Sequence, residues 1–600
     1  MSADWADVQL WKPAELQFAV KNLQKVEDSI VELGSDLVGA KPKSWSGTAA
    51  AAALSEWSSI NESLEDRLTE IAAVRRGLSE AFDAATGIVN LRDQAIAFAE
   101  GNELVIVDNM VLDTRVEGLL PRVHASVMNH AERRQLQDKC AAMVEEVVRR
   151  AGYMDQDLVN LLNTGVLAGE LAQLDSPSLR AARRLGASEG ESGIYAPPTG
   201  DGTPDQNAAY WNALAPGEQA EVIEKHPEWI ANRDGIPYAA RDQANRALLP
   251  QYLDEWKRKL RQAQEERDAL AGKYFNGVEI SPEGQEEYRR LNAEIEQARE
   301  RVDSLGSVAE MAQRPNRMIL GLDLSEKRTQ SIVSVGNPDT ATHVGVFTPG
   351  LTSNVVGMKN YDTQMDQLRA VSGEALFRHG DAAGIEQGVE QVATITWMNY
   401  QSPQLTLDSV GDLDGDSVLE TNSAQAGGDR LARFHQGLQS ARDDGVNVTA
   451  LGHSYGSTTT GYALQQTTGV DRVAFYGSPG LSVDDVEDLK VRSGNVFYAE
   501  ADGDGIGDLA KFGKDPSEMP GITYLSTDKA TVNGEELSGV RLHSDYMLEE
   551  STIQYNLGVL VAGYPEDAIT GRSNLPLGEA YRARPDLGRM VEKPFGVFGR

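Results

Sequence analysis

The hydrophobic residues divide the chain into a helical first half and a mixed second half. Between Pro13 and Leu37 they recur every three or four positions, which is the spacing of one face of a helix. An alanine-rich stretch that also reads as helix runs from Thr48 to about Gly101, and more helices follow, for example in AERRQLQDKCAAMVEEVVRRAG. The sequence therefore predicts a large all-α region at the N-terminal side.

A second pair of helices is predicted between Tyr252 and Leu305, with SPEGQ at the turn. In the second arm the apolar residues alternate spacings of three and four, at Tyr288, Leu291, Ile295, Ala298, Val302 and Leu305. This spacing is typical of a coiled-coil seam, but two heptads fit an ordinary amphipathic helix equally well.

From Met318 onward the pattern changes to short apolar runs separated by helical segments. The runs are MILGLDL, QSIVSVG, HVGVFTPG, VATITWMNY, VNVTALG, RVAFYGS and NVFYAEAD. Such runs with helices between them form a mostly parallel sheet. Residues 315–565 are therefore predicted to be an α/β domain, with a mostly parallel sheet and flanking helices.

Composition supplies the remaining boundaries. Residues 186–207, GASEGESGIYAPPTGDGTPDQN, are rich in Gly, Pro and Ser and indicate a linker or exposed loop. The last residues, rich in Pro, Gly and Arg, indicate a tail. The predicted segments are a helical hairpin at 1–115, further helices at 116–185, the linker at 186–207, a coiled-coil-like hairpin at 208–314, the α/β domain at 315–565 and the tail at 566–600.

Charge and cysteine content exclude several classes of protein. The 600 residues carry a formal net charge of −35, which argues against binding to nucleic acid or to anionic lipid. The lone Cys140 allows no internal disulfide and is expected to be a buried structural residue. The N-terminus has no signal-peptide pattern, and no window holds 18 apolar residues. We therefore expect no integral membrane segment, and either a cytoplasmic location or an export route that needs no signal peptide.

One motif in the α/β domain carries chemistry. Gly452-His453-Ser454-Tyr455-Gly456 fits the pattern G-x-S-x-G, and it follows a predicted strand and precedes a predicted helix. At such a corner the serine backbone is strained, its Oγ projects above the sheet edge, and side chains two residues away would collide with the turn. We therefore expect Ser454 to be a nucleophile and His453 to belong to the packing or the cavity wall. A glycine-rich turn without chemistry is the alternative.

A serine needs a base and an acid to act as a nucleophile. In an α/β-hydrolase the chain order is Ser, acid, His, and His543 is the only one of the eight histidines that follows Ser454. The acid should follow a strand, and NVFYAEADGDGIGD supplies Asp502, Asp504 and Asp508. We predict Asp504 as the acid, with Asp502 as the alternative. A calcium loop is disfavoured because the closing glutamate is missing, so neither a metal nor a cofactor is expected.

The oxyanion hole requires backbone N–H groups from the residue after the nucleophile and from a loop after an earlier strand. The amide of Tyr455 fits the first position. The loop that follows HVGVFT contains Gly350, Leu351 and Thr352, whose amides are candidates for the second position. A plain turn is the alternative there, because Pro-Gly is a common turn dipeptide.

Several of these segments resemble an actinobacterial α/β-hydrolase family that was long catalogued as a domain of unknown function. They are GLDLSEKRTQSIVSVGNPDTATHVGVFTPGLTS, TITWMNYQSP, VTALGHSYGSTTTG, VAFYGSPG and the upstream HPEWIANRDGIPYAARDQANR. The resemblance spans about residues 220–565 and implies a serine hydrolase without an assigned substrate, with Ser454, Asp504 and His543 at the triad positions. The acid loop is unusually rich in Asp and Gly, which leaves the choice between Asp502 and Asp504 open.

The helical region resembles the WXG-type hairpins of type VII secretion substrates. Trp45-Ser46-Gly47 lies between two long predicted helices, and YMDQD (153–157) and YAARD (238–242) fit the Y-x-x-x-D/E element of such substrates. The resemblance implies a WXG-type helical partner or the secretion machinery as a binding partner. A helical bundle that merely packs on the hydrolase domain is the alternative.

The sequence thus supports two hypotheses for function. In the first, the protein is an esterase-like or lipase-like serine hydrolase that cleaves a carboxylic ester through an acyl-enzyme. The loop from Gln401 to Gly427 is long enough to be its lid. In the second, the protein is a type VII-exported effector or an envelope protein whose helical half binds partners, with a hydrolase domain that is secondary or inactive. The acyl and alcohol groups of the substrate cannot be read from the sequence.

Overall fold

The structure, a computed structural model, contains two compact units, Met1–Val222 and Ile223–Arg600. It describes residues 3–40, 44, 46–114, 130–166, 178–189, 196–275, 281–403, 418–442, 444–504, 512–514 and 516–571. The finer division of the chain into six segments stays a prediction.

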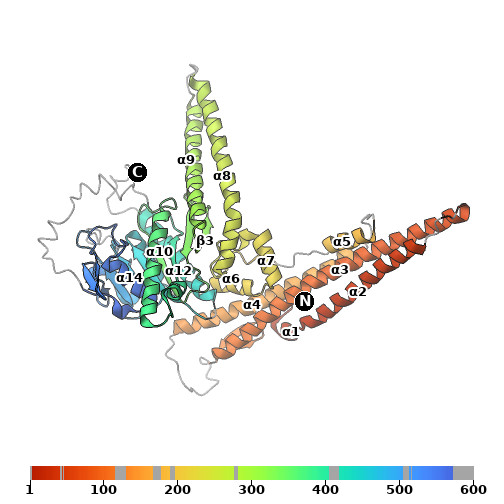
Figure 1. The fold of residues 1–600 in the computed structure, drawn as a ribbon, viewed down its shortest axis with the longest axis horizontal. Coiled ribbons are helices and arrows are strands. Elements are labelled where there is room, and N and C mark those ends of the chain that lie inside the picture. Colours follow the sequence, from red (N-terminus) through yellow and green to blue (C-terminus); the bar gives the residue numbers. More distant parts are fainter. Residues whose placement is uncertain are drawn as a thin grey trace. The chain divides into compact units, whose positions relative to one another are not determined.

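The N-terminal unit is a helical assembly, as the hydrophobic pattern predicts (Figure 1). Its elements are α1 (Trp5–Gln9), α2 (Pro13–Ala40), α3 (Thr48–Gly101), the paired strands β1 (Leu104–Val107) and β2 (Met110–Asp113), α4 (His130–Asn160) with a π-helical turn (Leu161–Val166), α5 (Leu179–Glu189), α6 (Pro204–Asn212) and the start of α7 (Pro216–Lys225). The two long predicted helices correspond to α2 and α3, which lie side by side. Cys140 of α4 is fully buried, as expected for a structural cysteine.

Alanine-rich packing builds the core of this unit. The α3 residues Ala81, Ala84 and Ala85 are buried against Val144 and Val147 of α4. Small side chains let the helix backbones approach closely, which is consistent with the alanine-rich sequence of α3. The region predicted as a linker at 186–207 includes the end of α5 and the start of α6.

The motifs of the secretion resemblance fall in several places. Trp45 lies outside the described residues, and Gly47, with φ of 107°, directly precedes α3. Tyr153 is exposed on α4, whereas Tyr238, in the second unit, is fully buried. A buried tyrosine cannot be read from the surface without local unfolding, so only the first of the two tyrosine elements is accessible.

The second unit is built on an eight-stranded sheet with the order β10-β9-β8-β7-β5-β6-β4-β3. The strands are β3 (Arg317–Asp323), β4 (Gln330–Val335), β5 (His343–Thr348), β6 (Val392–Met398), β7 (Asn447–His453), β8 (Arg472–Tyr476), β9 (Val496–Ala499) and β10 (Thr523–Tyr524). β4 is antiparallel to both β3 and β6, and the other pairs are parallel. All seven predicted apolar runs form strands, so the prediction of a mostly parallel α/β sheet is confirmed.

Helices cover both faces of this sheet. One apolar cluster joins Val346 and Ala450 to α12 (Val418–Ser440) and α13 (Tyr455–Leu464). The other joins their sequence neighbours Phe347 and Leu451 to α10 (Met358–His379) and α14 (Thr552–Ala562). Successive strand residues point to opposite faces, so two separate cores form and the strands are apolar throughout.

The second unit also contains several smaller elements. They are α11 (Ile385–Glu390), the hairpin strands β11 (Ala530–Val532) and β12 (Glu535–Leu537), and 3₁₀ turns at Pro227–Trp229, Val486–Asp488, Pro516–Glu518 and Pro565–Asp567. Among the described residues, no helix has both the length and the apolar character that a membrane span requires.

A long helical hairpin, α8 (Tyr238–Phe275) and α9 (Pro282–Ala312), belongs to this same unit (Figure 1). SPEGQ does not form its turn but opens α9, because Ser281 caps the helix and Pro282 occupies its first position. The predicted seam is largely buried at Leu291, Ile295, Ala298 and Leu305.

The hairpin also completes the α/β core. Leu305, Val308 and Met311 of α9 pack on Ile319 and Val333 of the sheet. This packing explains why the compact unit starts upstream of the predicted α/β domain.

Residues upstream of α9 cover the edge strand β3. Asn232 bonds both the N–H and the carbonyl of Leu322, at 2.8 and 2.9 Å. Asp242 accepts the N–H of Ile319 at 2.7 Å. Unpaired groups on an edge strand are templates for association with other chains, and these side chains occupy them.

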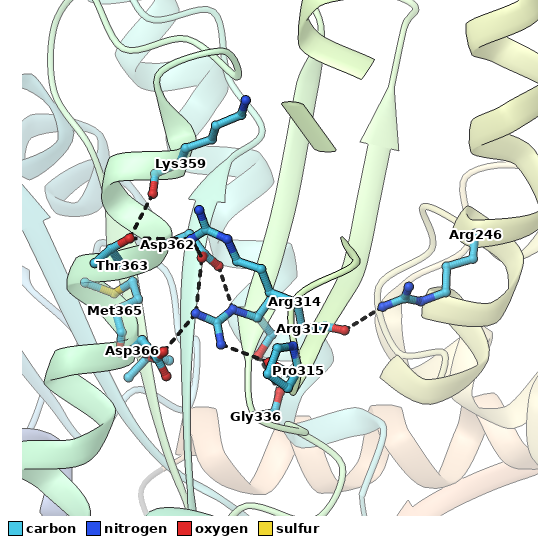
Figure 2. Close-up of polar contacts among 12 residues, drawn as sticks. Arg246, Arg314, Pro315, Arg317, Gly336, Lys359, Asp362, Thr363, Met365 and Asp366 are labelled. Atoms are coloured by element: carbon cyan, nitrogen blue, oxygen red, sulfur yellow. Dashed lines mark hydrogen bonds and ion pairs between the residues drawn. The ribbon is translucent and has the colours of Figure 1, made fainter. Parts of the chain in front are cut away.

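Polar contacts also fix β3 to α10 (Figure 2). The Arg317 guanidinium donates to Asp362 at 3.0 and 3.2 Å and to Asp366 at 2.9 Å, and Arg314 donates to Asp362 at 2.7 Å. Arg246 of α8 donates to the Arg317 carbonyl at 2.6 Å. The paired charges stabilise the position of α10, which forms one wall of the site described next.

Candidate active site

Ser454 lies at the corner between β7 and α13. Its φ of 54° and ψ of −132° are strained for a residue other than glycine. Its N–H donates to the Tyr476 carbonyl at 3.1 Å, and its carbonyl accepts the Ser457 N–H at 2.9 Å. The ends of two neighbouring strands and the first turn of α13 thus hold the strained backbone in place.

The two glycines that flank this corner are required by space. A Cβ atom on Gly452 would lie 2.8 Å from Cα of Ser457, and one on Gly456 would lie 2.1 Å from the Thr348 carbonyl oxygen. Neither backbone contact could relax without moving the corner. The steric reason given for the G-x-S-x-G pattern therefore applies to both positions.

The structure brings His543 and Asp504 together. Nδ1 of His543 lies 2.9 Å from Oδ2 of Asp504, and both side chains are buried. Of the two predicted acids, Asp504 makes this contact, whereas Asp502 is half-buried two residues away in the same loop. Asp508 lies outside the described residues.

Tyr546 is a further member of this cluster that the sequence analysis did not single out. Its hydroxyl donates to Oδ2 of Asp504 at 2.7 Å and accepts the N–H of Ala501 at 2.9 Å. Burial, followed by the neighbouring Asp504 carboxylate, raises the pKa of Tyr546 well above its usual range, so it stays a donor. Its position three residues after His543, in HSDY, is the signal that could have found it.

Gly477, directly after β8, makes room for the pair. A Cβ atom there would lie 2.7 Å from Oδ2 of Asp504 and 3.0 Å from Nδ1 of His543. With φ of 55° the position also favours glycine. The glycine in VAFYGSPG therefore has a direct role in the geometry of the site.

His453 packs beside the same pair. Its Nε2–H donates to the His543 carbonyl at 2.9 Å, and the two imidazole rings lie 4.8 Å apart. Burial, and then the nearby His543, lowers the pKa of His453 to about 3, so the ring is neutral at physiological pH. This agrees with the expectation of a packing or wall residue, and it adds a support for the His543 loop.

The loop after β5 approaches Ser454 closely. A Cβ atom on Gly350 would lie 2.9 Å from Oγ of Ser454, so only glycine fits there. Ser402 donates to the Gly350 carbonyl at 2.8 Å, and Tyr400 donates to the Pro349 carbonyl at 2.5 Å. The Gly350 carbonyl and the Leu351 N–H share one planar trans peptide and point in opposite directions. The bond from Ser402 therefore fixes the orientation of the Leu351 amide.

The amide of Thr352, one of the predicted oxyanion donors, is already engaged within the fold. Its N–H donates to the Pro403 carbonyl at 2.9 Å, and its φ is 61°. An amide that is already donating cannot also stabilise an oxyanion at full strength. Gly350 and Leu351 therefore remain as the candidate donors of this loop. The Tyr455 amide remains a candidate at the start of α13, while its side chain packs between Tyr400 and Phe512.

A cavity of about 620 Å³ connects these groups. It is lined by Ser454, His543, Gly350 and Leu351, together with residues of α10 and of the loop after His543. The volume is within the range of small-molecule sites.

No cluster of three metal-ligating side chains occurs among the described residues. Residues 404–417, most of the predicted lid, lie outside the described part of the chain.

The sheet order, the strained corner at Ser454 and the presence of His543 in the same cavity define the fold as that of an α/β-hydrolase. A family model described as alpha/beta hydrolase matches residues 325–514, a range that includes Ser454 and Asp504. An uncharacterized protein of Mycobacterium bovis, Mb0988c, is 30% identical over 245 residues, which are 39% of this chain and 85% of that protein. The chain belongs to this family of alpha/beta hydrolases.

Longer relatives extend the similarity into the helical unit. The uncharacterized protein Rv2079 of Mycobacterium tuberculosis strain H37Rv is 27% identical over 477 residues, which are 76% of this chain. The counterpart MT2140 of strain CDC 1551 matches to the same extent. The chain spans about 65% of the length of these two relatives. No solved structure matches the chain.

Proposed function

We propose that the protein is a serine hydrolase that cleaves a carboxylic ester through Ser454, His543 and Asp504. The observation that carries this proposal is the 2.9 Å contact between His543 Nδ1 and Asp504 Oδ2, with His543 and Ser454 lining one cavity. The contact to the carboxylate keeps the proton on Nδ1. Nε2 is then the basic nitrogen that can take the serine proton.

The reaction follows from these positions. His543 Nε2 takes the proton of Ser454 Oγ as the oxygen attacks the ester carbonyl carbon, and the carbonyl oxygen becomes an oxyanion. The amide of Tyr455 and those of Gly350 and Leu351 stabilise that charge. The protonated His543 then gives its proton to the departing alkoxide, which leaves as the alcohol. A water molecule, deprotonated by His543, hydrolyses the acyl-enzyme and regenerates the serine.

The first experiment is labelling of the full chain with a fluorophosphonate probe. Wild type should be labelled, and Ser454→Ala and His543→Ala should not, because the probe requires an activated serine. The substitution Glu549→Gln, exposed in the loop after His543 and outside the cavity lining, is the matched control and should be labelled at a rate close to wild type. Circular dichroism confirms that each variant is folded. No labelling of folded wild type would contradict the proposal.

A second role, binding of a helical partner by the N-terminal unit, is favoured by the surface of α2. Phe18, Val26 and Leu33 are large apolar side chains that stay exposed, and their spacings of eight and seven residues place them on one face of the helix. Such residues mark interaction surfaces when they gather on one element. Export by a type VII-like route would account for this surface. It predicts wild-type protein outside the producing cells and loss of that fraction on changing Trp45 and Gly47 to alanine, with cell-retained protein still folded.

A further inference from the structure

The cavity beside Ser454 is lined by two chemically different sets of side chains. One set comes from the start of α10 and includes the amides Asn360 and Gln364. These two residues are four positions apart, so they lie on the same helix face. The other set is apolar and consists of Phe347, Met547 and Leu548.

The charge of the cavity is the first clue to its ligand. Among the described residues that line the cavity, Asp545 is the one carboxylate, and none is Lys or Arg. Asp545 accepts the Leu542 N–H at 3.1 Å and the Ser544 hydroxyl at 3.3 Å, so it is part of the loop structure. A substrate that carries a carboxylate or phosphate would meet no counter-charge here, in a chain of net charge −35.

Two basic residues that contact or belong to the first turns of α10 are already paired. Lys359 forms an ion pair with Glu310. Arg314 donates to Asp362 at 2.7 Å (Figure 2). Recruiting either one to an anionic ligand would break an existing pair. The electrostatics therefore favour a neutral group against α10.

The side-chain amides of the cavity wall indicate which neutral ligand group would bind there. Each of Asn360 and Gln364 presents both an N–H donor and a carbonyl acceptor, which together match hydroxyl groups. Two other polar residues of the lining are engaged within the fold: Asn354 accepts the Gly357 N–H at 2.9 Å, and Ser353 lies 3.2 Å from the Tyr361 hydroxyl. Asn360 and Gln364 are the α10 side-chain amides in the lining that can bind hydroxyl groups of a ligand.

The apolar set suits the acyl group. Met547 is buried, and Leu548 follows it with half of its surface exposed at the cavity. Apolar lining removes acyl methylene groups from water, which stabilises binding in proportion to the area covered. The cavity thus offers an apolar part and a neutral hydrogen-bonding part next to one serine.

We propose that the substrate is an acyl ester of a neutral polyhydroxy alcohol, with Asn360 and Gln364 binding the alcohol hydroxyl groups. The proposal rests on the proposed serine hydrolase function. It excludes esters whose alcohol part carries a phosphate or carboxylate. Glycerol and a sugar offer the same hydroxyl chemistry, and the experiment distinguishes them.

The test compares kcat/KM for four butyrate esters on the full chain: glycerol monobutyrate, glucose monobutyrate, the butyrate of glycerol 3-phosphate, and p-nitrophenyl butyrate. We expect the better of the two neutral polyol esters to exceed the phosphate ester by at least 10-fold. Gln364→Leu and Asn360→Leu should each lower the ratio of polyol ester to p-nitrophenyl ester about 10-fold, since a hydrogen-bond pair is lost. Gln367→Leu, on the same helix but outside the cavity lining, is the matched control and should leave the ratio unchanged.

Fluorophosphonate labelling of the same preparations distinguishes failure of the substrate proposal from failure of the hydrolase proposal. Labelled protein that prefers the phosphate ester, or hydrolyses neither polyol ester, overturns the substrate proposal and leaves the hydrolase proposal standing. The same holds if both leucine variants keep the wild-type ratio. Folded wild type that is not labelled overturns the hydrolase proposal and the substrate proposal with it.

Discussion

The helical unit and the site around Ser454, at the carboxyl ends of the strands, differ in the partners of their buried carboxylates. In the helical unit, Glu27 of α2 is fully buried and accepts bonds from Arg75 of α3 and Arg183 of α5. Arg133 and Asp113 form a second buried pair at 2.6 Å. Each of these carboxylates meets a full positive charge, and each pair ties together separate elements.

At the carboxyl ends of the strands, the corresponding carboxylate, Asp504, contacts a histidine where Glu27 and Asp113 contact arginines. Asp504 is surrounded by the imidazole of His543 and the hydroxyl of Tyr546. In the proposed reaction His543 becomes an imidazolium when it takes the serine proton, and an ion pair with Asp504 then forms. A buried carboxylate that is always paired with a cation contributes to the folded structure. A carboxylate whose counter-ion forms during the reaction instead stabilises the transition state.

The largest expected effect comes from removing that negative charge. Asp504→Asn should lower kcat for p-nitrophenyl butyrate by about 10³–10⁴-fold, because the amide no longer stabilises the imidazolium or fixes its tautomer. Asp502→Asn, two residues away, is the control and should stay within about threefold of wild type. Equal losses in the two variants would show that the choice of Asp504 is mistaken.

A smaller effect is expected when the ion pairs of the helical unit are broken. Glu27→Gln should lower the free energy of unfolding by roughly 2–3 kcal/mol, less than for a fully buried pair because the arginines reach solvent. Arg75 and Arg183 are 20% and 30% exposed, respectively. Asp28→Asn removes the exposed neighbour and should change stability by less than about 1 kcal/mol. Urea unfolding provides the measurement, and a Glu27→Gln variant as stable as wild type would contradict it.

Two buried histidines make the α/β unit sensitive to acid. Burial lowers the pKa of His435 to about 3, as it does for His453. The unfolded chain binds these protons near pH 6.5, so this stability is complete above pH 6.5 and is lost as pH falls toward 3. Each histidine should therefore reduce stability by about 2 kcal/mol at pH 5 relative to pH 8.

His435→Met tests this pH dependence with a side chain that carries no charge. In the described part of the chain both ring nitrogens of His435 lack a hydrogen-bond partner, so an apolar side chain of similar volume should fit. We expect the difference in urea midpoint between pH 8 and pH 5 to shrink relative to wild type. An unchanged difference would mean that other groups control the acid response.

The smallest expected effect concerns the oxyanion loop. Ser402→Ala removes the donor that holds the Gly350 carbonyl, and the Leu351 amide should lose its fixed direction. We expect kcat to fall about 10-fold, a fraction of what loss of a whole oxyanion donor causes, with KM nearly unchanged. Ser402→Thr keeps the hydroxyl and should recover most of the rate. A rise in KM without a change in kcat would contradict a positioning role.

The sequence was most informative where local sterics or strand pattern decide the structure. The seven strands and the Ser454 corner follow from short patterns, and His543 follows from chain order because no other histidine comes later. The sequence favoured Asp504 but kept Asp502 as an alternative, because the contacts of Asp504 with His543 and Tyr546 come from residues distant in the chain.

Other features depend on partners that are distant in sequence. The amide of Thr352 is engaged by the carbonyl of Pro403, about 50 residues away, which no local pattern reveals. The contacts of Asn232 and Asp242 with β3 likewise connect segments separated by about 80 to 90 residues. The hydrophobic pattern predicted β3 itself, but not that Asn232 and Asp242 cover its edge.

The residues that cover the edge of β3 limit how far the chain can be shortened from its N-terminal side. A fragment that starts at residue 315 would keep Ser454, Asp504 and His543, yet it would lose Asn232, Asp242 and the α9 side chains that pack on Ile319. Its bare edge strand and uncovered apolar face would favour association between copies. Gene designs for crystallisation or screening should therefore begin near Ile223 and retain the whole helical hairpin, even though the family match itself starts about one hundred residues later.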